Sequence, residues 1–194
     1  MDRLDLPGAD LRYDAQAYPP AQADALFAAL LAEIPWQPHR LRLFGRDVDA
    51  PRLSCWIGDA QAVYTYSGTR FEPRPWTPTV AALRDDLRRR LGAHFNSVLA
   101  NLYRDGRDSM GWHSDDESEL GREPLIASLS FGAVRTFRLR SRATREAALS
   151  IELEHGSALV MAAGTQRHYQ HALPRRARVA APRINLTFRR IASV

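Results

Sequence analysis

Lysine is absent from this sequence, so every one of its 27 basic residues is an arginine. Cysteine occurs once, at Cys55, which rules out a disulfide framework and a thiolate metal cluster within the chain. No apolar run approaches the length of a membrane span, and the first residues lack the basic-then-apolar pattern of a signal peptide. We therefore expect a cytoplasmic protein, of the kind found in a bacterial cytosol, with no membrane partner.

The charge balance is the first positive signal. The formal net charge is +5 and the isoelectric point is about 10, values typical of proteins with an anionic partner, most often nucleic acid. Arginine suits phosphate recognition because its planar guanidinium donates paired hydrogen bonds, although GC-rich codon usage is the simpler explanation of the missing lysine. With 194 residues, 45% of them hydrophobic and 25% charged, the chain predicts one soluble globular domain, which we expect to be a monomer.

Two amphipathic helices are predicted in the first half of the chain. The first spans 21–34, with its apolar residues on one stripe, and stops at Pro35. The second begins after Thr77, with Pro78 at its first helical position, and ends at Gly92.

Most of the remaining chain has the short apolar or alternating runs typical of strands. Many short strands after two helices predict a mainly β protein with flanking helices (α+β). The expected fold is a jelly roll, or double-stranded β-helix, with the N-terminal helices packed on one sheet. The predicted strands are 40–44, 62–66, 97–103, 125–131, 135–139, 148–153, 157–162, 168–171 and 184–191.

A histidine and a carboxylate stand two residues apart at His113 and Asp115. Side chains at this spacing share one face of an extended segment, so both can point at one ion. A later histidine would complete the two-histidine, one-carboxylate set that holds non-haem Fe(II) with coordination positions left open. His168 and His171 are both candidates, and spacing alone does not decide between them.

Two alternatives remain open for this pattern. The stretch is strongly acidic, because Asp116 and Glu117 follow directly, and such a stretch is more often a solvated loop than a metal site. Two histidines with one carboxylate also suit catalytic zinc.

The last predicted strand favours iron. Four polar residues alternate there with three apolar ones, so that the polar residues share one face of the strand. Arginines inside a β-sheet protein are costly to bury unless an anion pairs with them, and a dicarboxylate would fit two of them. An edge strand with an exposed polar face is the alternative. The polar residues are Arg183, Asn185, Thr187 and Arg189.

Taken together with further motifs, these residues make the chain resemble the AlkB family of Fe(II)/2-oxoglutarate-dependent dioxygenases over about residues 43–191. It is most similar to the branch that acts on alkylated bases in duplex DNA, through the segments 43–46 and 64–68. The other motifs that carry the resemblance are 101–106, 113–117, 126–132, 155–156, 171–174 and 183–189.

The resemblance implies a role for each residue of the metal site and its surroundings. The iron ligands would be His113, Asp115 and His171, the last because it directly precedes a small residue, a leucine and a proline. Around the co-substrate, Asn101 and Tyr103 would form hydrogen bonds with 2-oxoglutarate, Arg183 and Arg189 would pair with its carboxylates, and Asn185 and Thr187 would support the pocket.

The resemblance also implies a substrate side. Phe44, beside Gly45, would wedge into the base stack while Arg46 holds phosphate. The lid over the flipped nucleotide would include Tyr64, Thr65 and Tyr66, with Tyr66 as the stacking ring, and the base edge would be read by Asp116 and Glu117.

The expected activity is direct-reversal repair: oxidative demethylation of bases such as 1-methyladenine and 3-methylcytosine. It would use Fe(II), 2-oxoglutarate and O2, and would release formaldehyde, succinate and CO2. Expected partners are alkylated DNA, duplex or single-stranded, and RNA. The alternatives are the same chemistry on RNA or protein, and a non-catalytic basic nucleic-acid-binding protein. We expect an N-terminal arm at 1–20 and one dioxygenase domain at 21–194, with a nucleotide-recognition lid at about 39–76 and a jelly-roll core at about 96–191.

Overall fold

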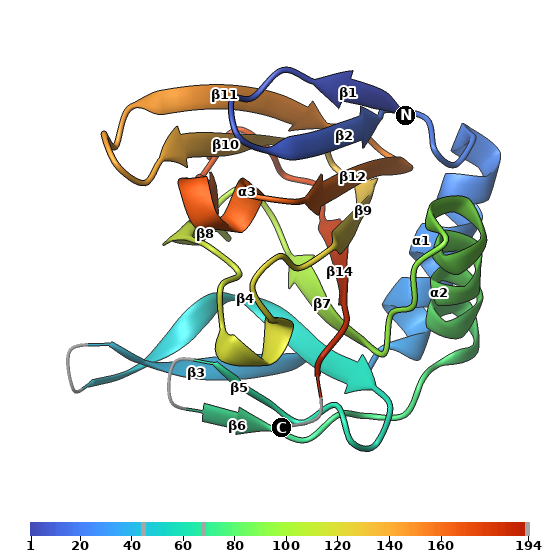
Figure 1. Ribbon diagram of the computed structural model, residues 1–194. Coiled ribbons are helices and arrows are strands. Elements are labelled where there is room, and N and C mark those ends of the chain that lie inside the picture. Colours follow the sequence, from blue (N-terminus) through green and yellow to red (C-terminus); the bar gives the residue numbers. More distant parts are fainter. Residues whose placement is uncertain (44–45, 67–68, 193–194) are drawn as a thin grey trace.

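A computed structural model describes the backbone of residues 1–43, 46–66 and 69–192, and the side chains of these residues apart from 39–43, 46–48, 64–66 and 69–71. Two β-sheets face each other, as Figure 1 shows. The elements in chain order are β1 (Asp2–Leu4), β2 (Asp10–Asp14), α1 (Pro20–Glu33), β3 (Gln37–Leu43), β4 (Arg46–Gly58), β5 (Tyr64–Tyr66), β6 (Thr69–Phe71), α2 (Pro78–Leu91), β7 (Ser97–Tyr103), β8 (Met110–His113), the 3-10 turn η1 (Ser118–Leu120), β9 (Ile126–Gly132), β10 (Arg135–Ser141), β11 (Ala147–Leu153), β12 (Ser157–Ala162), α3 (Thr165–His168), β13 (Tyr169–Leu173) and β14 (Arg183–Arg189).

The larger sheet has the strand order β1-β2-β12-β9-β14-β7-β4-β3, and the smaller one has the order β11-β10-β13-β8. All pairings within these two sheets are antiparallel. A separate pair, β5 with β6, lies below the larger sheet in the view of Figure 1. This arrangement confirms the predicted mainly β fold of two sheets.

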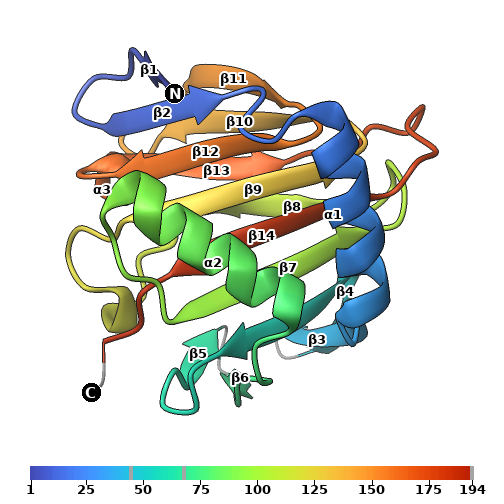
Figure 2. The ribbon, with the colours of Figure 1, turned by 90° about the vertical axis from the view of Figure 1, so that its right-hand side faces the viewer.

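Helices α1 and α2 cover the outer face of the larger sheet, where they lie across β9, β14 and β7 in Figure 2. Leu30 of α1 and Leu87 of α2 are fully buried there against Leu186 and Phe188 of β14. Because side chains alternate along a strand, burying these apolar residues outward turns the polar residues of β14 toward the smaller sheet. The packing of the helices therefore fixes which face of β14 lines the interior.

The first residues add two strands to the larger sheet. The segment 1–20, for which the sequence predicts an arm, contains β1 and β2, and β2 pairs with β12 through Leu11 and Met161. The segment 39–76, predicted as a lid, contains most of β3 and all of β4, β5 and β6, and β4 pairs with β7 through Cys55 and Ala100. Among the described helices, none is long and apolar enough to cross a membrane.

The two helices are joined by Glu33, the last residue of α1. Its carboxylate accepts hydrogen bonds from the backbone N–H (3.0 Å) and the hydroxyl (2.5 Å) of Thr79 in the first turn of α2. Partial burial raises the pKa of Glu33, but the two bonds from Thr79 outweigh it and hold this pKa below its ordinary value. Glu33 thus serves as the cap that orients α2 on the sheet.

Glu33→Gln is expected to lower the free energy of unfolding by about 1 kcal/mol at neutral pH, as loss of a helix cap does. A carboxyl whose pKa is lower in the folded state stabilises the fold above its unfolded pKa, and this contribution is lost on protonation. The difference between the two proteins should therefore shrink as the pH falls below the ordinary value of 4.5. Urea denaturation at neutral pH and at pH about 3.5 measures it. An equal difference at both pH values would contradict the charged cap, and Glu123→Gln, in an exposed ion pair with Arg167, is the control.

Candidate metal and co-substrate site

The three candidate metal ligands meet on the inner face of the smaller sheet. His113 ends β8 and lies directly opposite His171 of β13 in the strand register. Their ring centroids are 4.2 Å apart. Asp115 follows two residues after His113, and one ligand atom from each of the three side chains lies within 4.8 Å of the others. The structure thus brings together the three residues that the resemblance implied, with His171 as the third.

The imidazoles are held in defined orientations. Nδ1 of His113 lies 2.8 Å from the carbonyl oxygen of Gly111, which can only accept, so the neutral ring donates from Nδ1 and keeps the lone pair on Nε2. That Nε2 is the atom nearest the Asp115 carboxylate, at 3.7 Å. The ring of His171 is stacked on Phe137, with centroids 5.2 Å apart. Both rings are therefore oriented before any ion binds.

Asp115 is 3% exposed and is held from two sides. Nη2 of Arg189 donates to its Oδ2 at 2.8 Å, and its backbone N–H donates to Oε1 of Gln166 in α3 at 2.9 Å. Burial raises the pKa of Asp115, but the charge of Arg189 and the two imidazoles outweigh this effect and hold the pKa well below its usual range. The carboxylate is consequently ionised at neutral pH.

The pKa values of both histidines are lowered, which keeps the imidazoles neutral, as a metal ligand must be. Burial, joined by the neighbouring His113, lowers the pKa of His171 to about 3, and burial also lowers the pKa of His113. Two neutral imidazoles and one carboxylate form a donor set that suits a divalent ion such as Fe(II). The residues present therefore fit a mononuclear iron with coordination positions left open.

The larger sheet supplies the opposite wall of the same pocket. Across the β7–β14 register, Asn185 lies opposite Asn101 and Arg183 lies opposite Tyr103. The pocket lined by these four residues also includes the three metal-ligating residues, together with Thr187 and Arg189. All four polar residues of β14 are at most 8% exposed, so β14 is an interior strand rather than an edge strand.

Arg183 is a buried cation that lacks an anionic partner among the described residues. It is 2% exposed, its Nη2 donates to the Ser130 hydroxyl at 2.9 Å, and its guanidinium lies 5.3 Å from the Tyr103 ring centre. Its Nε is buried and makes no hydrogen bond, and no carboxylate lies within ion-pair distance in the described part of the chain. Burial lowers the pKa of Arg183 to about 10, which leaves it charged at neutral pH. A carboxylate of 2-oxoglutarate would satisfy this donor.

Arg189 and Arg183 therefore differ in their surroundings, although they share one face of β14. Arg189 contacts the metal-ligating Asp115. Between them, Nδ2 of Asn185 donates to the Ser128 hydroxyl (2.8 Å) and the Leu129 carbonyl (3.0 Å), and Thr187 donates to Oδ1 of Asn185 (3.1 Å). Asn185 and Thr187 form a hydrogen-bonded support for the pocket wall.

Two residues predicted on the substrate side lie beside the metal pocket rather than in its wall. Asp116 is exposed and forms an ion pair with Arg142 at 2.6 Å. Glu117 is half-buried, and both acidic residues line a neighbouring surface depression that also contains Arg167. His168, the rival candidate for the third ligand, is exposed at the end of α3.

The other predicted substrate residues fall in the lid segment. Phe44 and Gly45 lie outside the described residues. Arg46 begins β4, and Tyr64, Thr65 and Tyr66 form β5. The side chains of these four residues lie outside the described part of the structure. The wedge and lid roles stay predictions.

Sequence reasoning missed three buried polar residues around the site: Arg52, Arg135 and Gln166. Arg52 donates to Asn101, Gln166 accepts from Asp115, and Arg135 donates to three backbone carbonyls of the adjoining loops. The one local signal was the alternation from Arg52 to Ile57, in which polar residues and Trp56 alternate with apolar ones, because it indicates a strand.

Residues 10–189 match the family model of the 2OG-Fe(II) oxygenase superfamily. The chain is 41% identical over 179 residues to the alpha-ketoglutarate-dependent dioxygenase alkB homolog 3 of Bos taurus, covering 88% of this chain but only 62% of that protein's length. It is 42% identical over 181 residues to the DNA oxidative demethylase ALKBH2 of Homo sapiens, covering 88% of this chain and 69% of that protein.

The solved structure of OsALKBH1 aligns with a TM-score of 0.60 at 18% identity, over 97% of this chain and 100% of that one, and it supports the jelly-roll fold alone. The family model spans nearly the whole chain, and its name agrees with the iron-type donor set and the buried arginine described above. The chain therefore belongs to the 2OG-Fe(II) oxygenase superfamily and, through its identity to alkB relatives, to the AlkB family within it.

Proposed function

We propose that this protein is a dioxygenase that uses Fe(II), 2-oxoglutarate and O2 to demethylate alkylated bases in DNA, foremost 1-methyladenine and 3-methylcytosine. One observation carries the proposal. A set of two histidines and one aspartate, of which Asp115 and His171 are buried and His113 half-buried, lies in the same pocket as Arg183, a buried cation with a donor that no described protein group satisfies. A metal donor set beside a buried cation favours an enzyme over a non-catalytic binding protein.

The chain's own residues prepare the pocket for this chemistry. His113, His171 and Asp115 would hold the iron and leave coordination positions open for the co-substrates. Arg183 would take a carboxylate of the co-substrate. When bound, Fe(II) and 2-oxoglutarate supply the oxidation of the alkyl carbon by O2, with release of formaldehyde, succinate and CO2. Apolar side chains such as Phe137 and Leu173 line the rest of the pocket and exclude water.

The outer face of the smaller sheet supports a nucleic-acid substrate. Trp112, next to His113, is 38% exposed, and the guanidinium of Arg140 lies over its ring at 4.3 Å. Arg140 and Arg145 both donate to a single acceptor, Oε1 of Gln170, at 2.9 and 2.6 Å. Two cations that converge on one neutral amide repel each other, and no ion pair of theirs with a carboxylate is found among the described residues. A phosphate would relieve this repulsion, and a base could stack on the tryptophan.

DNA is favoured as the substrate because a relative with 42% identity is named as a DNA oxidative demethylase. A base within a duplex must be flipped out to reach a buried pocket, which costs a few kcal/mol and less for a lesion that cannot pair. This cost gives the pocket a physical preference for N-methylated bases, since 1-methyladenine and 3-methylcytosine have lost their normal pairing edge.

The substrate class is tested with one panel of methylated substrates: single-stranded DNA, duplex DNA and single-stranded RNA, each carrying 3-methylcytosine, and a methylated peptide. Formaldehyde release is expected from both DNA forms, faster than from RNA, and none from the peptide. Arg140→Gln should slow turnover on every nucleic acid alike, because phosphate contacts carry no sequence information. A clear preference for RNA would overturn the DNA assignment, and release from the peptide alone would overturn the nucleic-acid class.

A further inference from the structure

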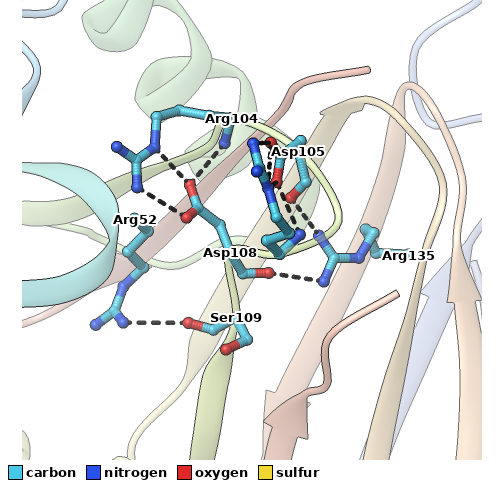
Figure 3. Close-up of polar contacts among 7 residues, drawn as sticks. Arg52, Arg104, Asp105, Asp108, Ser109 and Arg135 are labelled. Atoms are coloured by element: carbon cyan, nitrogen blue, oxygen red, sulfur yellow. Dashed lines mark hydrogen bonds and ion pairs between the residues drawn. The ribbon is translucent and has the colours of Figure 1, made fainter. Parts of the chain in front are cut away.

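Arg52 is a buried arginine on β4 that none of the motifs includes. Its side chain is 4% exposed and lies against the loop 104–109, which connects β7 to β8 (Figure 3). That loop joins the strand that carries Asn101 to the strand that carries His113. A buried guanidinium requires strong partners, because an unpaired cation in the interior costs several kcal/mol.

The first partner of Arg52 is the side chain of Asn101. Nε of Arg52 donates to Oδ1 of Asn101 at 2.9 Å, and both side chains are buried. A guanidinium has only donors, so it must face the oxygen of the amide and not its nitrogen. The bond therefore fixes which way round the Asn101 amide sits, and leaves its NH2 group as the donor for the pocket that Asn101 lines.

The second partner is the backbone just before β8. Nη1 of Arg52 lies 3.4 Å from the carbonyl oxygen of Ser109, a longer contact that Figure 3 marks. The rest of the loop is held independently: Arg104 forms an ion pair with Asp108 at 2.8 Å, and Arg135 donates to the Asp108 carbonyl at 2.9 Å. Arg52 is thus not required to close the loop, and the contact to Asn101 is its shorter one.

We infer that Arg52 is a positioning residue for the co-substrate: it holds the Asn101 amide with its NH2 group toward the pocket, where it donates to an oxygen of 2-oxoglutarate. This inference rests on the proposed co-substrate. Without Arg52, the amide is free to turn its oxygen to the pocket, next to the carboxylates of the co-substrate, and an attraction becomes a repulsion. Arg52 acts on 2-oxoglutarate through Asn101 and touches neither the iron ligands nor the substrate.

Arg52→Met is the central variant, because methionine fills similar space but donates nothing. Its affinity for 2-oxoglutarate, measured by the thermal shift of the Mn(II)-loaded protein, should fall on the order of 10-fold. The KM for 2-oxoglutarate should rise by a similar factor, with a smaller change in kcat. Arg104→Met is the matched control: it removes an arginine from the same loop region that does not contact Asn101, and its affinity should match the wild type.

A double-mutant cycle with Asn101→Ala separates positioning from a general structural role. If Arg52 acts through Asn101, adding Arg52→Met to Asn101→Ala should weaken 2-oxoglutarate binding no further. Fully additive losses would overturn the inference, as would an Arg52→Met protein with wild-type affinity. Absence of a thermal shift in the wild-type protein would instead count against the proposed function itself.

Asn101→Asp keeps the inference testable if Arg52→Met does not fold. Aspartate preserves the acceptor for Arg52, so the fold and the Arg52 contact should be retained. It replaces the NH2 donor with a second acceptor, and 2-oxoglutarate binding should therefore be lost to below detection. Wild-type binding by a folded Asn101→Asp protein would show that the NH2 group does not face the co-substrate.

Discussion

Replacing His171 with alanine is expected to abolish formaldehyde release and to weaken Fe(II) binding by more than the roughly 10–100-fold that loss of an outer partner costs at metal sites. Among the described residues, His171 is one of the three proposed ligands of the iron. It is 4% exposed and stacked on Phe137, so no nearby side chain can move into its place without repacking the pocket. Iron content after anaerobic Fe(II) loading, measured together with turnover, checks the expectation.

His168→Ala is the matched control for this variant. His168 lies three residues earlier, is exposed, and was an equal candidate for the third ligand on spacing alone. The control should retain both iron and turnover. If His171→Ala keeps its iron while His168→Ala loses it, the assignment of the third ligand is wrong.

Replacing Arg183 with methionine is expected to raise the 2-oxoglutarate concentration needed for half-maximal turnover by about 30-fold to several thousand-fold, since removing one partner of a buried charge pair costs about 2–5 kcal/mol. The Nε of Arg183 has no hydrogen-bond partner and no described carboxylate lies within ion-pair distance, and we therefore propose that Arg183 binds a carboxylate of the co-substrate. DNA affinity should stay unchanged, because Arg183 is buried at 2% exposure and cannot reach a phosphate.

Arg190→Met is the control for Arg183→Met, because Arg190 is exposed directly after β14. Kinetics at varied 2-oxoglutarate, with DNA binding measured in parallel, test the pair. An unchanged dependence on 2-oxoglutarate in Arg183→Met would contradict the clamp. Arg189 is a less specific probe: it donates to Asp115, so its removal is expected to disturb the metal ligand as well.

Much of the site could be predicted from the two-residue repeat of side chains along a strand. The two-residue repeat of strands placed the four polar residues of β14 on one face, and all of them line the pocket. The same repeat paired His113 with Asp115, which the structure brings together with His171. These features depend only on neighbours along the chain, so the sequence is sufficient to show them.

Contacts between segments that are distant in the chain could not be predicted from the sequence. Arg52 and Asn101 are 49 positions apart, and Asp115 and Gln166 are 51 apart, so no local pattern links them. The same holds for the acidic pair after Asp115, Asp116 and Glu117. The resemblance implied that Asp116 reads the base edge, and the structure shows an ion pair between Asp116 and Arg142, 26 positions later, which no local pattern indicated. Register across sheets decides such pairings, and register is set by the whole core.

The fold, like the site, could be predicted from the sequence only in part. Both long helices were predicted from their end signals, and Gly92 ends α2 with a φ of 63° that favours glycine. β7 and β12 have the predicted bounds. β4 was not predicted, because Pro51 interrupts the alternation of apolar and polar residues. A proline fits in a strand only where its missing N–H is not required for a hydrogen bond to the neighbouring strand.

The central claim is that this pocket couples 2-oxoglutarate oxidation to base demethylation, and the most direct test is the yield of two products in one reaction. The wild-type protein with Fe(II), 2-oxoglutarate, O2 and DNA containing 3-methylcytosine should form formaldehyde and succinate in equal amounts, with unmodified cytosine recovered in the strand. No formaldehyde and no recovered cytosine from an iron-loaded, 2-oxoglutarate-binding protein would contradict the claim.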